Sequence, residues 1–134
     1  MLGRRRFLEL ATSVVGALAA LPASIARARS KKLALPLDKA EKLKQVGGSI
    51  TLKIGKRKIL FIRDGQASIR AVNPSCPHAR CDVAYHSESN RIKCPCHRSA
   101  FDLDGKVLSG PSPAPLETYP ARLDGDRIVF TVEE

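Results

Sequence analysis

The chain has 134 residues, with 23 basic and 13 acidic side chains that give a formal net charge of +10. This length allows one domain with a single core, and the lack of tryptophan means that mainly aliphatic residues build it. No stripe of alternating aromatic and basic residues accompanies the charge, which disfavours nucleic-acid binding. We interpret the charge as solubility and electrostatic steering toward an acidic partner or an anionic lipid surface.

The first thirty residues have the features of an export signal. Arg4-Arg5-Arg6-Phe7-Leu8 resembles the twin-arginine signature, which implies export of a folded protein, and an alanine-rich apolar run follows it over 10–20. Ala26 and Ala28 fit a small-residue cleavage site. If it stays uncut, the stretch 10–26 is just long enough, at about 17 residues, to span a membrane. We therefore predict that residues 1–30 are a twin-arginine signal or a membrane anchor.

Residues 31–45 are predicted to form a linker and a short helix. The stretch 27–36 is basic and has no sustained hydrophobic period. Asp38 and Glu41 then have the spacing of a capping box. Apolar residues follow at helical spacing before a glycine pair: Leu37, Ala40, Leu43 and Val46. We expect a helix over 39–45 whose role is packing.

The pattern changes to strands and turns after Ser49. Apolar residues occupy every second position over 50–54, 59–61, 69–71 and 128–132. Turn dipeptides punctuate the chain: Gly55-Lys56, Asp64-Gly65, Asp104-Gly105 and Asp124-Gly125. Several short strands at this spacing predict an all-β sandwich or barrel over 46–134.

Two short boxes offer metal ligands. Cys76-Pro77-His78 and Cys94-Pro95-Cys96-His97 each supply a thiolate and an imidazole, and 15 residues separate His78 from Cys94. A structural zinc site is one interpretation, because zinc prefers tetrahedral Cys2His2 sets, but the mixed pair in each box favours electron chemistry. A four-ligand site does not need Cys81 and Cys96, and these two cysteines could bridge the loops in an oxidising compartment.

These boxes, with the turn and proline loop that follow them, closely resemble those of the Rieske 2Fe–2S proteins. The similarity runs from about Val46 to Val132, nearly the whole of the folded part. It implies a small antiparallel β sandwich or barrel in which two loops form a cluster-binding subdomain. It also implies one Rieske-type 2Fe–2S cluster, with Cys76 and Cys94 on one iron and His78 and His97 on the other, and a disulfide between Cys81 and Cys96.

Some positions depart from the pattern of quinol-oxidising members. Arg80 and Arg98 replace glycines, so we expect the loop path to differ locally, and Ala79 replaces a bulkier apolar residue. Ser99 is expected to donate a hydrogen bond toward a cluster sulfur, whereas Phe101 replaces a tyrosine that does the same. Such hydrogen bonds raise the reduction potential, so we predict a potential below that of tyrosine-containing relatives. The proline loop over 111–115 is expected to cover the cluster.

The resemblance implies one-electron transfer as the iron–sulfur subunit of a cytochrome bc-type quinol-oxidising complex. Quinol and cytochrome subunits would then be its partners, and no catalytic residue of its own is predicted. Two other functions stay open: a small Rieske subunit of a molybdenum oxidase of the arsenite oxidase type, and a free periplasmic electron carrier. The export signal predicts the periplasmic face of a bacterial inner membrane, with the protein anchored or, after cleavage, soluble.

Overall fold

The computed structural model describes residue 16 and residues 29–133. The twin-arginine motif and the cleavage motif therefore lie outside the described residues, and so does most of the apolar run. Within the part of the chain that is described, no helix is long and apolar enough to cross a membrane.

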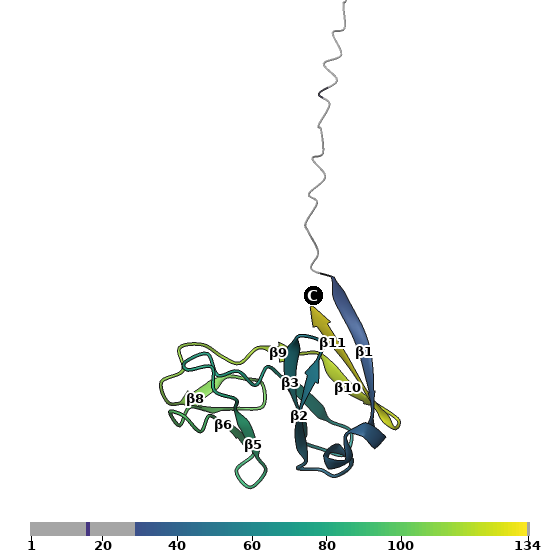
Figure 1. The fold of residues 1–134 in the computed structure, drawn as a ribbon, viewed down its shortest axis with the longest axis horizontal. Coiled ribbons are helices and arrows are strands. Elements are labelled where there is room, and N and C mark those ends of the chain that lie inside the picture. Colours follow the sequence, from purple (N-terminus) through teal and green to yellow (C-terminus); the bar gives the residue numbers. More distant parts are fainter. Residues whose placement is uncertain (1–15, 17–28, 134) are drawn as a thin grey trace, which may run out of the picture.

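Three antiparallel sheets make up the fold, which confirms the all-β prediction (Figure 1). The first sheet has the order β1–β11–β10, and consists of β1 (Ser30–Pro36), β11 (Arg127–Glu133) and β10 (Ala121–Asp124). The second has the order β2–β3–β4–β9, and consists of β2 (Ser49–Ile54), β3 (Arg57–Arg63), β4 (Ile69–Val72) and β9 (Thr118–Tyr119). The third has the order β5–β6–β7–β8, and consists of β5 (Ala84–His86), β6 (Arg91–Lys93), β7 (Ala100–Phe101) and β8 (Val107–Ser109).

The first two sheets enclose one hydrophobic core and form the base of the molecule. Phe61 of β3 and Phe130 of β11 meet edge to face there, with ring centroids 5.0 Å apart. The alternating apolar residues predicted over 50–54, 59–61, 69–71 and 128–132 lie in β2, β3, β4 and β11 and pack in or against this core. Gly55 and Gly125 hold φ angles of 63° and 62° in the two hairpin turns, as turn glycines do.

The structure differs from the linker and single short helix predicted over 31–45: a strand takes the place of the linker, and the helical part is shorter and of the 3-10 type. Residues 30–36 form β1, which pairs with β11 along its whole length and places Leu33 and Leu35 against the core. Two short 3-10 helices, η1 (Leu37–Lys39) and η2 (Glu41–Lys44), then replace the helix. Neither has a side-chain cap, so the capping box does not form. Ala40 and Leu43 are both fully buried, and this three-residue spacing matches the tighter 3-10 turn.

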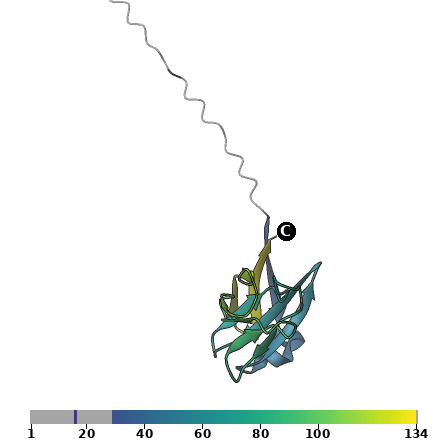
Figure 2. The same ribbon diagram turned by 90° about the vertical axis from the view of Figure 1, so that its left-hand side faces the viewer.

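An inserted subdomain, residues 73–117, contains the third sheet. Its ends leave the base side by side, because β4 and β9 pair through Ala71↔Tyr119 and Val72↔Thr118. The subdomain lies to one side of the base in Figure 1 and in front of it in Figure 2. It has its own hydrophobic core, in which Ile92 and Phe101 are fully buried.

Strand β3 connects the two cores, because both of its faces are buried. Ile59 and Phe61 point into the core of the base, whereas Leu60 and Ile62 point into the core of the inserted subdomain. The sequence pattern indicated only the first of these two faces. A strand covered on both sides has a continuous apolar run, and β3 has four consecutive buried residues.

Candidate metal centre

Both predicted ligand boxes form the same six-residue loop. In the first loop (76–81) and in the second loop (94–99), the opening cysteine donates its backbone N–H to the closing residue, and the fifth residue donates back to the cysteine. These bonds are Cys76 N–H to Cys81 O (2.9 Å), Arg80 N–H to Cys76 O (2.7 Å), Cys94 N–H to Ser99 O (2.8 Å) and Arg98 N–H to Cys94 O (3.1 Å). The repeated hydrogen-bond pattern gives the two boxes matching backbone geometry.

The arginine in each loop has a left-handed backbone. Arg80 has φ 54° and Arg98 has φ 57°, the region in which a Cβ atom costs about 1–2 kcal/mol relative to glycine. The expectation that these arginines change the loop path stays a prediction; both lie in the left-handed region that glycine also adopts. Both side chains accept the left-handed conformation, because the loop hydrogen bonds fix the backbone.

The four predicted ligands separate into a buried pair and an exposed pair. Cys76 and Cys94 are outside any disulfide and lie in the core of the inserted subdomain, at 1% and 2% exposure. His78 and His97 are exposed, and their rings meet edge to face with centroids 4.6 Å apart.

A buried pair of cysteines and an exposed pair of histidines suit a centre that contains two metal ions. Among residues 29–133, no three His, Cys, Asp or Glu side chains are grouped so as to hold one metal ion. A cluster with two thiolates on one iron and two imidazoles on the other needs only two protein ligands at each metal. The residues present therefore fit such a group.

A disulfide between Cys81 and Cys96 joins the two loops, as the family resemblance implies. The Cα atoms of the two cysteines are 6.4 Å apart, and the two residues are 15 positions apart in sequence. Cys81 closes the first loop and Cys96 lies within the second, so the bond fixes the two ligand boxes relative to each other. Cross-linking over a loop of this length contributes about 3 kcal/mol in the chain-entropy account.

The proline loop packs against the second ligand loop through Ser99. The Ser99 side chain is fully buried, and its Oγ accepts a hydrogen bond from the backbone N–H of Ser112 at 3.1 Å. The Oγ of Ser112 in turn donates to the carbonyl of Ala114 at 2.8 Å. Because Ser99 Oγ is an acceptor in this contact, its own proton stays available for another acceptor, which suits the predicted bond to a cluster sulfur.

Two residues of this contact were not identified from the sequence. Ser112 lies between two prolines, and that was the only signal of its role. Gly110 has φ 91°, and a Cβ atom there would lie 2.5 Å from the Cα of Ser99. The sequence shows this glycine before the proline run but not the backbone that it approaches. Phe101, the other predicted tuning residue, is fully buried opposite Ile92.

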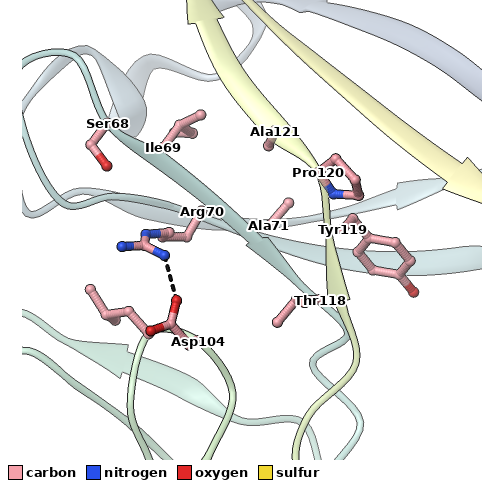
Figure 3. Close-up of a pocket in the computed structure, with 10 residues that line it drawn as sticks. Ser68, Ile69, Arg70, Ala71, Asp104, Thr118, Tyr119, Pro120 and Ala121 are labelled. Atoms are coloured by element: carbon pink, nitrogen blue, oxygen red, sulfur yellow. Dashed lines mark hydrogen bonds and ion pairs between the residues drawn. The ribbon is translucent and has the colours of Figure 1, made fainter.

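Ion pairs join the inserted subdomain to the base. Arg70 of β4 donates to Asp104 in the subdomain at 2.7 Å, at the edge of a hollow of about 550 Å³ (Figure 3). It also donates to Asp64 in the base at 3.1 Å. Burial raises the pKa of Asp64, but hydrogen bonds from Ser68 and Arg70 outweigh burial and hold that pKa below its ordinary value. No cysteine or histidine lines this hollow, so it is separate from the candidate metal centre.

Comparisons with known proteins agree with this geometry. The cytochrome b6-f complex iron-sulfur subunit of Chlorobaculum thiosulfatiphilum is 35% identical over 85 residues, which cover 63% of this chain and 46% of that subunit. The corresponding subunit of Synechococcus sp. (strain JA-3-3Ab) is 36% identical over 77 residues, or 58% of this chain and 45% of that one. The chain therefore spans somewhat less than half the length of these curated relatives.

Comparisons with solved structures also find proteins of similar fold. A cyanobacterial plasma membrane Rieske protein from Synechocystis PCC 6803 superposes with a TM-score of 0.59 at 28% identity, covering 73% of this chain and 97% of that one. The ferredoxin of carbazole 1,9a-dioxygenase from Nocardioides aromaticivorans superposes with a TM-score of 0.59 at 27% identity, covering 72% of this chain and 92% of that one. Residues 34–120 match the Rieske 2Fe–2S domain family, whose members hold one Rieske-type cluster. On this match, and on the paired cysteines and histidines described above, the chain belongs to the Rieske 2Fe–2S domain family.

Proposed function

We propose that the chain transfers single electrons through a Rieske cluster held by Cys76, Cys94, His78 and His97, as the iron–sulfur subunit of a cytochrome bc-type quinol-oxidising complex. The observation that carries this proposal is a buried cysteine and an exposed histidine in each of two loops that a disulfide joins, with the two histidine rings in contact. When bound, such a cluster accepts and releases one electron at a potential between about −150 and +300 mV.

The two kinds of ligand would have different tasks. Cys76 and Cys94 lie among apolar side chains of the subdomain core, so water is excluded from their sulfurs. His78 and His97 lie at the surface, where a partner can approach the ring edges. The Cys81–Cys96 disulfide keeps both histidines on one face.

Membership of a bc-type complex is supported by the relatives. The curated relatives reported above are named as cytochrome b6-f complex subunits, at about 35% identity. We propose on this basis that quinol and cytochrome subunits are partners, and that the N-terminal segment brings the protein to the periplasmic face of the membrane by the twin-arginine route. One observation favours a second function, a free carrier, because a ferredoxin is equally similar in structure.

The test is electron paramagnetic resonance of the reduced protein, expressed with its N-terminal segment and divided into membrane and soluble pools. A rhombic signal with an average g below the free-electron value, found with the membranes and with co-purifying cytochromes, is the expected result. The same signal in a soluble, unattached protein would favour the carrier, and co-purification with a molybdenum subunit would favour the oxidase. Zinc-loaded protein without the signal would contradict electron transfer altogether.

Variants of two histidines make this test specific. His97→Ala should abolish the signal, because it removes a proposed iron ligand. His86→Ala is the matched control, since His86 is also an exposed histidine of the subdomain but lies on β5, outside both loops. Loss of the signal in both variants would show a general effect on folding and would not support the ligand assignment.

A further inference from the structure

Two positive charges flank the exposed histidine pair. Arg80 and Arg98 follow His78 and His97 closely in the two loops and are exposed. Within residues 29–133 neither side chain makes an ion pair or a hydrogen bond. The acidic residue next to the first loop, Asp82, pairs with Lys58 at 2.8 Å and so does not neutralise Arg80.

The overall charge of the chain does not explain this placement. The inserted subdomain has five basic and five acidic residues, a net charge of zero. Its acidic residues lie outside the two loops, at positions 82, 88, 102, 104 and 117. The loops that hold the ligand boxes therefore carry a local charge of +2, whereas the rest of the subdomain, with three basic and five acidic residues, carries −2.

The backbone conformation of these two arginines raises the free energy of the folded state. Both have a left-handed φ, which glycine adopts without strain, and the same choice occurs in both loops. An exposed arginine that pairs with no other residue within 29–133 gains no interaction there that offsets this strain. A partner molecule that binds the arginine side chains can offset this strain.

Hollows beside each arginine enlarge the positive surface. Arg80 borders one of about 420 Å³ that is also lined by Lys56, Arg57 and Lys58. Lys58 pairs with Asp82 and Arg57 lies 3.8 Å from Glu117, so Lys56 is the residue that adds positive charge to this hollow. Arg98 borders another of about 450 Å³ that is also lined by Lys93, and this one has no acidic residue in its lining. We call the surface formed by Arg80, Arg98 and these two hollows the basic face.

We infer that the basic face is the docking surface for a redox protein whose own contact surface carries carboxylates. This inference rests on the proposed function, because a carrier must bring its exposed ligands close to the redox centre of a partner. An acidic partner would place carboxylates over both arginines, with the histidine edges between them. An anionic membrane surface has the same charge but offers no redox centre, so the protein partner is favoured.

The test measures electron transfer from the reduced protein, as the full chain with its cluster, to ferric cytochrome c in a stopped-flow instrument. One electron leaves the cluster and reduces the haem iron, so the protein is oxidised and the cytochrome becomes ferrous. Cytochrome c is used in its basic native form and after light succinylation of its lysines, which reverses its charge. We expect the succinylated form to react about tenfold faster at low salt, and the two rates to converge near 0.5 M salt.

Charge-matched variants locate the effect. The double variant Arg80→Gln with Arg98→Gln should lose most of the preference for the succinylated form. The control, Lys53→Gln with Arg122→Gln, removes the same charge from exposed positions on β2 and β10 of the base and should keep the preference. Equal preferences in the two double variants would overturn the inference.

Two further measurements separate the ways in which the idea can fail. The spectrum of the cluster is recorded first, and its absence would overturn both the proposed function and the basic face. An intact cluster with no preference between the two cytochrome forms would overturn the basic face alone. Sedimentation with phosphatidylglycerol vesicles is the last measurement. Binding that depends on Arg80 and Arg98, without any preference in the electron-transfer rates, would assign the surface to lipid and overturn the protein partner.

Discussion

Gly110→Ala tests how the proline loop is held against the second ligand loop. Gly110 has φ 91°, and a Cβ atom at this position would lie 2.5 Å from the Cα of Ser99 and 2.9 Å from its backbone nitrogen. Contacts this short with backbone atoms cannot be relieved by turning a side chain. The proline loop must therefore move away from Ser99, and the hydrogen bond from Ser112 to Ser99 must lengthen or break.

The expected loss of stability follows from these contacts. A left-handed backbone costs an alanine about 1–2 kcal/mol, overpacking adds about 1–3 kcal/mol, and loss of the Ser112 hydrogen bond adds about 1 kcal/mol. We expect a loss of about 3–6 kcal/mol for Gly110→Ala. Gly125→Ala is the matched control, because Gly125 also has a positive φ, 62°, but a Cβ there meets nothing within 4 Å. It should lose only about 1–2 kcal/mol.

The assay is thermal unfolding of both variants at one scan rate, followed by the rate of cluster loss in the presence of an iron chelator. In a domain of about 100 residues, 1 kcal/mol lowers Tm by about 4–8 °C, so Gly110→Ala, with at least about 2 kcal/mol of additional loss, should melt at least about 8 °C below Gly125→Ala. Its cluster should also be lost faster, because the loop beside Ser99 has moved. Equal Tm values and equal rates of cluster loss would refute the close approach between Gly110 and Ser99.

Four further predictions follow from the same structure. Cys81→Ser with Cys96→Ser should still bind the cluster but lose about 3 kcal/mol of stability and release iron faster; unchanged iron release would show that the disulfide does not stabilise the site. Phe101→Tyr should raise the reduction potential in voltammetry, whereas Phe101→Leu, which adds no donor, should not; equal potentials for wild type and Phe101→Tyr would remove the argument from the missing hydroxyl. Arg80→Gly and Arg98→Gly should each stabilise the fold by about 1 kcal/mol in denaturant titrations, because glycine relieves the left-handed strain, and a destabilised glycine variant would contradict it. The pKa of Asp64 is lowered in the folded state, so its contribution to stability is present above the unfolded value of 3.8 and is lost as the pH falls through the folded pKa; Asp64→Asn should flatten the pH dependence of unfolding below pH 3.8, and an identical acid profile would count against the pair with Arg70.

The local pattern of residues was sufficient to predict much of the fold and to propose the ligand set. Alternation of apolar and polar residues predicted strands β2, β3, β4 and β11, because a half-buried strand has a side-chain period of two. The same reasoning failed for 31–45. Whether a short basic segment is a linker or a strand depends on whether another strand lies beside it, and here β11 supplies that partner from the far end of the chain.

The sequence by itself determined the family and the candidate ligands, because the cysteine and the histidine of each box lie within three residues of each other and the spacing between the two boxes can be read directly from the sequence. Only the tertiary structure decided which of these residues are buried and which are exposed, that Arg80 and Arg98 keep a left-handed backbone, and that Gly110 touches Ser99. Each of these features depends on contacts between segments that are distant in sequence or on backbone angles imposed by loop closure. The side-chain pattern of a single segment contains neither.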